Sequence, residues 1–515
     1  MEVSSEVRQV TREKARSRKA KRVWKLKFNI NWEAIKSAFR RNTKLHYLSC
    51  APTVKRLSST IKVHKEVYMS THPVAQPKIK VRRARKSLEF LLRISQEVNE
   101  GKGLTAPASS PRENISMKWR EFHGSYNWEN LLDPLHPWLR RELIKYGDLA
   151  EATYDGFDSD PLSDYYGSCR FNMQKLFQEV GLAKYGYEVT SYIHALSRVD
   201  VPDWLEKSNE TWSKESNWMG YVAVSNDEES QRIGRRDIVV VWRGTVAPTE
   251  WLLDLRTKLE VLDDTKAMVQ QGFLTIYKSK DELTRYNKLS ASEQVMQEVT
   301  RLVNSYKGRG EKVSLTTTGH SLGGALAVLS AYEAAQSFPG LFVSVISFGA
   351  PRVGNIDFKE KLNESGVKTL RVVVKQDVVP KLPGWLLNDN VNKLGKIGRR
   401  LKSVYRHVGT QLKLDLFASP YLKHESDLKG AHNLQTYLHL LDGFVSKKEK
   451  FRSNAKRDLA LVNKSTDMLI EDLKVPESWH QLPYKGLVLN KYGRWVRPHR
   501  EPEDIPCPPC HSTES

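Results

Sequence analysis

The sequence is poor in cysteine and has no long apolar run. Its four cysteines, Cys50, Cys169, Cys507 and Cys510, are too few and too scattered for a disulfide scaffold, which favours a reducing compartment. Two prolines separate Cys507 from Cys510, so we do not expect a redox or metal site there. No apolar stretch approaches the roughly 20 residues of a membrane-spanning helix. No stretch of about 7 to 15 apolar residues follows the N-terminal basic residues, as a secretory signal would require.

Aspartate is also missing from the first 112 residues, and this absence locates the charge of the chain. Residues 1–112 hold 27 Lys and Arg against 8 Glu, a net charge of +19, whereas residues 113–515 carry only +3 of the total of +22. An evenly basic protein would suggest a nucleic-acid partner. A nearly neutral body with a basic arm does not, so we expect no nucleic acid to be bound.

The composition divides the chain into four segments. Residues 1–60 resemble an organellar transit segment, because they are rich in basic residues and Ser, although three glutamates fall within the first thirteen residues. Residues 61–116 continue the basic arm and end in a Pro- and Ser-bearing linker. Residues 117–500 are long enough for one large α/β domain with a well-buried core. Residues 501–515 form a C-terminal tail.

Short β-branched runs alternate with helical segments through the body. Pro137 opens a pattern of apolar residues at helical spacing that reaches Tyr154. The sequence further predicts strands at 221–224, 238–242, 313–318, 341–348 and 370–374, and helices at about 291–306, 322–337 and 356–364. Near-continuous apolar strands separated by helices predict an α/β fold with a mainly parallel sheet flanked by helices.

A GxSxG pattern lies where a predicted strand gives way to a predicted helix. It runs from Gly319 to Gly323, with Ser321 at its centre. Such a sharp turn needs glycines beside the serine and places the serine hydroxyl at the C-terminal edge of the sheet. The N–H of Leu322, at the start of the helix, would face a developing oxyanion. Thr245, after the strand 238–242, is the candidate second donor, although an ordinary turn is the alternative there.

A nucleophilic serine needs a base and an acid that follow it in the chain. Asp377 comes directly after the strand 370–374 and is the candidate acid, with Asp389 and Asp415 as substitutes. His432 precedes an amphipathic C-terminal helix and is the candidate base.

Of the other histidines that follow Asp377, three are alternative candidates for the base. His439 lies deep in the same predicted helix, where a packed core histidine is expected. His407 and His424 lie in polar surroundings that are typical of the surface.

With these motifs the sequence resembles the class 3 lipases, an α/β-hydrolase family, and more closely the plant class I phospholipases A1 of the chloroplast gamma group. The resemblance spans about residues 117–500 and is carried by the motifs 128–151, 217–220, 242–246, 249–256, 272–277, 319–327, 348–355, 377–380 and 432–443. It implies that Ser321, Asp377 and His432 form the catalytic triad. It also implies hydrolysis of the sn-1 acyl ester of glycerolipids such as phosphatidylcholine and galactolipids, without a metal or cofactor. The alternatives are a triacylglycerol lipase or galactolipase of the same fold, and a non-catalytic lipase-fold protein. The expected location is the chloroplast, with the cytoplasm as the alternative.

A glycerolipid substrate implies contact with a membrane surface, and two segments are candidates for it. Residues 246–271 include Trp251, Leu252 and Leu253 and could form a lid or, equally, a plain helix with a buried stripe. Residues 381–431 hold 10 Lys and Arg against 4 Asp and Glu, with Trp385 among them. This insertion suits an anionic lipid surface, and a solvated loop is the alternative. The sequence carries no signal of oligomeric state.

Overall fold

A computed structural model describes residues 114–498, except for 161, 164, 197–215, 246–257, 263–265, 384–404, 425–426, 453–454 and 482–485. The basic arm and the C-terminal tail with Cys507 and Cys510 lie outside the described residues.

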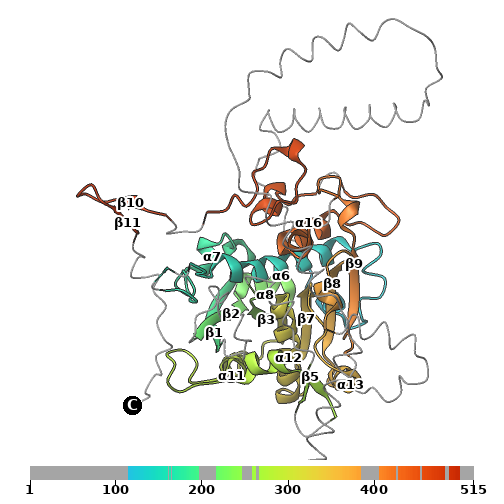
Figure 1. Cartoon of the computed structure of the whole chain (residues 1–515). Coiled ribbons are helices and arrows are strands. Elements are labelled where there is room, and N and C mark those ends of the chain that lie inside the picture. The colour runs from blue at the N-terminus through green and yellow to red at the C-terminus, as the bar shows by residue number, and fades with distance from the viewer. Residues whose placement is uncertain are drawn as a thin grey trace, which may run out of the picture. The chain divides into compact units, whose positions relative to one another are not determined.

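The described residues form a central sheet of seven strands in the order β1-β2-β3-β6-β7-β8-β9 (Figure 1). The strands are β1 Tyr187–Leu196, β2 Ser216–Ser225, β3 Arg236–Trp242, β6 Val313–His320, β7 Phe342–Phe348, β8 Lys368–Val374 and β9 Thr410–Leu414. The strands β1, β2 and β3 pair antiparallel, whereas β3, β6, β7, β8 and β9 pair parallel. The predicted α/β fold with a mainly parallel sheet is therefore confirmed.

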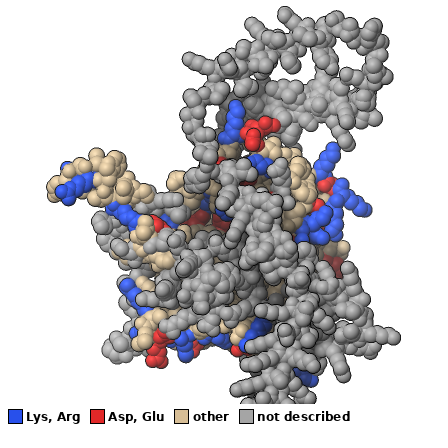
Figure 2. All heavy atoms as spheres, viewed as in Figure 1, with Lys and Arg blue, Asp and Glu red and all other residues tan. Residues whose placement is uncertain are grey.

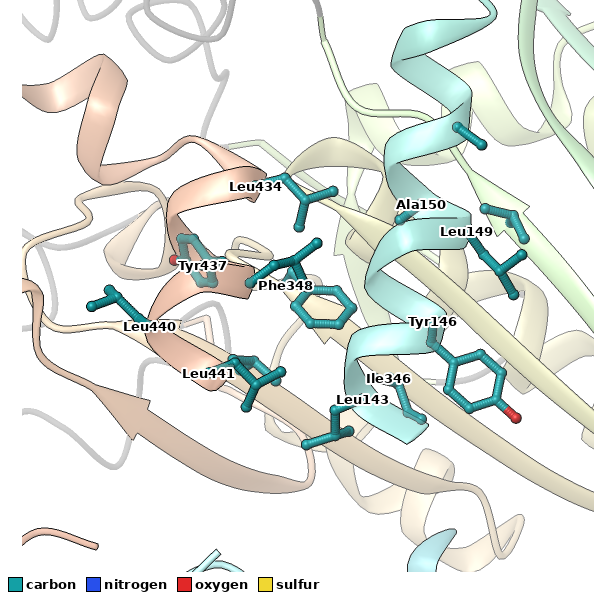
Figure 3. Close-up of a cluster of buried hydrophobic side chains, with 14 of the residues drawn as sticks. Leu143, Tyr146, Leu149, Ala150, Ile346, Phe348, Leu434, Tyr437, Leu440 and Leu441 are labelled. Carbon is teal, nitrogen blue, oxygen red and sulfur yellow. The ribbon is translucent and has the colours of Figure 1, made fainter. Parts of the chain in front are cut away.

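Helices cover both faces of this sheet. Alternate side chains of one strand divide between two apolar clusters: Val239 and Val241 of β3 lie in one, and Ile238 and Val240 in the other. The first cluster includes residues of α6 (Pro137–Asp155) and α16 (Leu434–Gly443), and Figure 3 shows these two helices meeting over Phe348. The second includes residues of α10 (Gln271–Lys278), α11 (Ala291–Gly308), α12 (Leu322–Ser337) and α13 (Ile356–Glu364). This two-sided burial explains the apolar runs of the inner strands.

Shorter elements complete the described part of the chain. The short helices are α5 Trp119–Phe122, α7 Leu176–Glu179, α8 Asp227–Ile233 and α15 Leu428–Ala431. The 3₁₀ turns are η1 Ala183–Tyr185, η3 Val379–Lys381, η5 Leu416–Ala418, η6 Leu459–Asn463 and η7 Glu471–Leu473. Two small antiparallel pairs join β4 Leu259–Val261 to β5 Met268–Gln270, and β10 Val488–Leu489 to β11 Trp495–Val496. No described helix combines the length and apolarity needed to cross a bilayer.

The insertion 381–431 differs from the sequence-based expectation. It contains β9, which pairs parallel to β8 and buries Leu412 and Leu414 in the core, so this part is a strand of the sheet and not a solvated loop. Trp385 lies outside the described residues. The lid candidates Trp251, Leu252 and Leu253 also lie outside them, and the described remainder of that segment contains β4 and β5.

Candidate active site

Ser321 occupies the turn between β6 and α12. The strand ends at His320 and the helix begins at Leu322, so the serine has a φ of 57° and a ψ of −128°. Positive φ is unfavourable for a residue with a side chain and persists only where the surroundings enforce it. Here the Ser321 N–H donates to the carbonyl of Phe348, the last residue of β7, at 2.9 Å. The serine is buried, and its hydroxyl has no hydrogen-bond partner in the described structure.

Two glycines allow the turn to lie against β3. A Cβ atom on Gly319 would lie 2.8 Å from the carbonyl oxygen of Trp242. A Cβ atom on Gly323 would lie 2.8 Å and 2.9 Å from the carbonyl carbons of Trp242 and Arg243. Backbone atoms cannot move aside easily, so both positions require glycine. The N-terminus of α12 is thereby held next to the end of β3.

Asp377 and His432 lie in direct contact. The loop after β8 brings Asp377 to the same edge of the sheet, and His432 lies between α15 and α16. His432 Nδ1 is 2.7 Å from Asp377 Oδ2, and both side chains are buried. Because a carboxylate can only accept, Nδ1 carries the ring proton and Nε2 is left with a free lone pair. The pair therefore presents a basic nitrogen to whatever lies next to Nε2.

Two more donors hold the carboxylate of Asp377. The backbone N–H of Val379 donates to Oδ1 at 2.9 Å, and the hydroxyl of Tyr437 donates to Oδ2 at 2.5 Å. Burial, and then the negative charge of Asp377, raise the pKa of Tyr437 well above its usual value. Tyr437 therefore stays protonated and able to donate. The acid is fixed in position before any substrate binds.

Three polar atoms at this sheet edge are buried without a hydrogen-bond partner in the described structure. They are Ser321 Oγ, His432 Nε2 and Thr245 Oγ1. Leaving a buried polar group unpaired costs about 1–3 kcal/mol, so folded proteins usually avoid it. The first is a hydroxyl, the second is the basic nitrogen of the Asp–His pair, and the third follows β3. The three atoms suit a substrate that the hydroxyl of Ser321 attacks, with His432 Nε2 as the base and Thr245 as a hydrogen-bond donor.

The loop after β3 brings Thr245 towards Ser321. A Cβ atom on Gly244 would lie 3.1 Å from Ser321 Cβ, which shows how closely the loop approaches the serine. Arg243 braces this loop, because its guanidinium donates to the carbonyls of Gly244 and Trp218, both at 3.0 Å. Burial lowers the pKa of Arg243 to about 10, and the group remains charged at neutral pH. The buried, charged side chain of Arg243 thus holds the loop in place.

His320 supports His432 from behind. Its Nε2 lies 2.8 Å from the carbonyl oxygen of His432, which can only accept, so Nε2 carries the proton. Its Nδ1 then accepts from the hydroxyl of Tyr154 at 2.7 Å. Burial, and secondarily His432, lower the pKa of His320 well below its usual value. A neutral His320 therefore links α6 to the loop that carries His432.

The other candidates lie elsewhere. His439 is buried, as expected, and is 2.8 Å from Ser419 Oγ, and His424 is exposed. His407 is partly buried, and burial, followed by the charge of Arg371, lowers its pKa to about 3. Asp415 caps the turn η5 and pairs with Lys375. Asp389 lies outside the described residues.

The residues that support the site had no clear sequence signal. Tyr437 and Tyr154 lie on helices more than a hundred residues from Ser321, and nothing in their local pattern marks a polar role. His320 and Arg243 lie inside recognised motifs, so proximity to the motif was the available signal for them. In the described part of the chain, no group of three or more His, Cys, Asp or Glu side chains could hold a metal ion.

This chain is similar to known proteins in sequence and in structure. Residues 239–387 match the family model described as Lipase (class 3). The chain is 47% identical over 402 residues to Phospholipase A1-Igamma1, chloroplastic, of Arabidopsis thaliana, and the alignment covers 74% of this chain and 78% of that protein. It is 45% identical over 350 residues to Phospholipase A1 EG1, chloroplastic/mitochondrial, of Oryza sativa subsp. indica, covering 65% and 77% of the two chains. The solved structure of the native Rhizomucor miehei lipase propeptide complex aligns with 53% of this chain and 68% of that chain, at 18% identity and a TM-score of 0.34. By the family match and the identity to these plant proteins, the chain belongs to the class 3 lipase family of α/β-hydrolases, within the group of plant class I phospholipases A1.

Proposed function

We propose that this chain is a phospholipase A1, a serine hydrolase that cleaves the sn-1 acyl ester of glycerolipids and releases a fatty acid and a lysolipid. Ser321, His432 and Asp377 are the proposed nucleophile, base and acid. The observation that carries the proposal is the set of buried atoms without a hydrogen-bond partner at the sheet edge, namely Ser321 Oγ, His432 Nε2 and Thr245 Oγ1. The names of the relatives supply the reaction class.

The proposed mechanism has two halves. His432 Nε2 takes the proton of Ser321 as Oγ attacks the ester carbonyl carbon, and Asp377 stabilises the resulting imidazolium. The oxyanion accepts from the N–H of Leu322, at the start of α12, and from Thr245. The intermediate then collapses, and His432 protonates the departing lysolipid alkoxide. Water, deprotonated by His432, next attacks the acyl-serine, and the fatty acid leaves as Ser321 regains its proton.

The nucleophile is tested by Ser321→Ala. We expect hydrolysis of phosphatidylcholine to fall by about 10⁴-fold or more, because the covalent route is lost. Ser330→Ala is the matched control, since it removes a buried serine hydroxyl from α12, the helix that follows Ser321; this hydroxyl accepts from Trp242 Nε1 at 3.0 Å. The control should lose some thermal stability and keep its turnover. Near-normal hydrolysis by Ser321→Ala would refute the proposal.

The substrate is tested with a lipid panel. Purified protein is given phosphatidylcholine, a galactolipid and a triacylglycerol, each with different acyl groups at sn-1 and sn-2, and the products are identified by mass spectrometry. The proposal expects sn-1 release from phosphatidylcholine. Preferential cleavage of the galactolipid or of the triacylglycerol would instead identify the chain as a galactolipase or a triacylglycerol lipase.

We also propose that the basic arm directs the protein to the plastid. The support is its transit-like composition together with the relatives named as chloroplastic. Nothing in these relatives supports the cytoplasmic alternative. The proposed division is a transit-like segment 1–60, an arm and linker 61–116, a catalytic domain 117–500 and a tail 501–515. Import of a fluorescent protein fused to residues 1–112 tests the role of the arm.

A further inference from the structure

The hairpin of β10 and β11, residues 486–498, exposes large apolar side chains. Leu487, Val488, Leu489, Tyr492 and Trp495 are each between 47% and 76% exposed. Scattered exposed apolar residues are normal on a protein surface, but five within nine residues are not. A cluster of this kind usually marks a surface that is covered by a partner.

The pairing of the two strands groups these side chains. Leu489 lies directly opposite Trp495, and Val488 lies opposite Val496. Residues directly opposite in an antiparallel pair share a face, and so do residues two apart along a strand. Leu487, Leu489 and Trp495 therefore share one face of the hairpin, and Arg497 lies on the same face, opposite Leu487.

The tip of the hairpin is built as a defined turn. The N–H of Asn490 donates to the carbonyl of Arg494 at 2.8 Å. Its side-chain oxygen accepts from the N–H groups of Tyr492 and Arg494, both at 3.0 Å. Gly493 has a φ of 72°, which this turn needs and glycine adopts without strain. The turn presents Lys491 and Tyr492 to solvent, with the ammonium of Lys491 5.1 Å from the centre of the Tyr492 ring.

The charge of the hairpin is of one sign. Residues 486–498 contain Lys491, Arg494 and Arg497 and no Asp or Glu (Figure 2). Arg497 is held by the body, because it pairs with Asp160 at 3.1 Å and donates to the carbonyl of Leu162. Leu162 is itself 75% exposed and adds to the apolar surface beside the hairpin. Lys491 and Arg494 are exposed.

We propose that the β10–β11 hairpin binds the surface of an anionic lipid bilayer. Trp and Tyr have an apolar ring and a polar group, which suits the boundary between headgroups and acyl chains. Leu487 and Leu489 would enter the acyl region, while Lys491 and Arg494 would meet anionic headgroups. A second copy of the chain fits less well, because a copy would bring the same positive charges against this one. The inference goes beyond the proposed chemistry, since binding through the hairpin does not use the triad.

The test measures binding of the full-length Ser321→Ala protein to vesicles, so that no substrate is consumed. The vesicles are phosphatidylcholine alone or phosphatidylcholine with 30% phosphatidylglycerol. Leu489→Ser/Trp495→Ser should weaken binding to the anionic vesicles by about tenfold or more, because both side chains are lost from the membrane. Lys491→Glu/Arg494→Glu should weaken it by about tenfold or more at low salt and by less at high salt.

Matched controls separate the hairpin from the rest of the basic chain. Leu283→Ser changes a leucine that is 96% exposed elsewhere, and Lys307→Glu/Lys312→Glu reverses two exposed charges elsewhere. Both controls should bind anionic vesicles within about twofold of the parent protein. Hydrogen exchange then locates the contact, because the amides of residues 487–497 should become protected when vesicles are added.

Several outcomes would overturn the inference. These are unchanged vesicle binding by both hairpin variants, equal losses in the controls, or no added protection of residues 487–497. Self-association that the Leu489→Ser/Trp495→Ser change abolishes would identify a second copy as the occupant and also overturn it. Hydrolysis of a soluble short-chain ester by the hairpin variants in an otherwise native chain reports on the active site separately. A failure of the proposed function can therefore be distinguished from a failure of the hairpin to bind the bilayer.

Discussion

At the scale of the single residue, the site depends on the hydrogen bonds around Asp377. His432, Tyr437 and the N–H of Val379 all donate to this one carboxylate. The bond from His432 sets which ring nitrogen carries the proton, and the other two fix where the carboxylate lies. His320 restrains the backbone of His432 in the same way. The geometry of the base is thus set by groups that do not touch the substrate in the proposed mechanism.

The Tyr437→Phe change tests one of these supports. It removes a donor at 2.5 Å from Asp377 and keeps the ring in its apolar cluster. A hydrogen bond to a charged group contributes about 1.5–3 kcal/mol, so we expect kcat to fall by roughly tenfold while KM changes little.

Tyr221→Phe provides the comparison for a buried tyrosine. Its hydroxyl donates to the carbonyl of Leu149 at 2.7 Å, away from the site. Both variants should lose similar thermal stability, but only Tyr437→Phe should lose kcat. Equal kcat values would mean that Tyr437 has a packing role alone.

The sequence was sufficient to place Asp377 and His432 together, for a physical reason. Asp377 follows a parallel strand, and the carboxyl ends of such strands meet at one edge of the sheet. Tyr437 could not be identified, because its contact depends on how α16 rotates against the sheet. The roles of Ser321, Asp377, His432, Leu322 and Thr245 in catalysis remain predictions.

At the scale of the element, the close approach of α12 to β3 determines where Ser321 lies. The helix begins directly at the serine, and Gly323 lies against the carbonyl groups at the end of β3. A shift of the helix would move both the serine and the N–H of Leu322. Misplacement by about 1 Å can cost on the order of a hundredfold in rate.

The Gly323→Ala change tests this contact. The added methyl group would overlap backbone atoms of Trp242 and Arg243, so the helix must move outward. Overpacking of this kind costs about 1–3 kcal/mol, and we expect an equal loss of stability together with at least a hundredfold loss of kcat. Thermal unfolding and turnover on a soluble ester measure the two effects.

Gly308→Ala is the matched change at a helical glycine. Gly308 is the last residue of α11, and a Cβ atom there would meet nothing within 4 Å. This variant should be as stable as the parent or slightly more stable, with unchanged turnover. If Gly323→Ala behaved in the same way, the close approach of α12 to β3 would not matter for the site.

The elements differ in how readily the sequence reveals them. The helix α11 matches its prediction because Ser290 and Glu293 form a capping box ahead of an amphipathic pattern. The strand β9 is not apparent in the sequence, because it lies within a basic stretch and buries only alternate residues, such as Leu412 and Leu414. The strand β1 is not apparent either, because the burial of its side chains follows no regular alternation. Strands at the edge of a sheet lack the continuous apolar runs of the inner strands.

At the scale of the whole molecule, buried histidines link folding to pH. Among the described residues, burial is the largest cause lowering the pKa of His123, His194, His320, His407 and His439, to about 3 for His194, His407 and His439. In the unfolded chain each would take up a proton near pH 6.5. Above that pH these histidines are neutral in both states, and the free energy of unfolding should not depend on them.

Below pH 6.5 the unfolded chain binds protons that the folded chain excludes, so the free energy of unfolding should fall as the pH falls. Each histidine contributes up to about 1.4 kcal/mol per pH unit until its folded pKa is reached. Asp155 acts in the opposite direction, because burial and then Glu151 raise its pKa to about 6, so the folded chain takes up a proton there. These histidines outnumber the one aspartate, so unfolding by urea should still be markedly easier at pH 5 than at pH 7.

A single substitution tests this link between burial and acid stability. In the folded chain His439 Nε2 lies 2.8 Å from Ser419 Oγ. The His439→Gln change keeps a polar side chain next to Ser419 but removes one group that takes up a proton on unfolding. The slope of unfolding free energy against pH between 6 and 5 should decrease by up to about 1.4 kcal/mol per pH unit. Tyr221→Phe also removes a buried polar group but should leave the slope unchanged, because burial raises the pKa of Tyr221 well above its usual value and a tyrosine is neutral at pH 5 and pH 6 in both states. Urea titrations at a series of pH values measure both slopes, and equal slopes for the two variants would show that burial of His439 does not drive the loss of stability in acid.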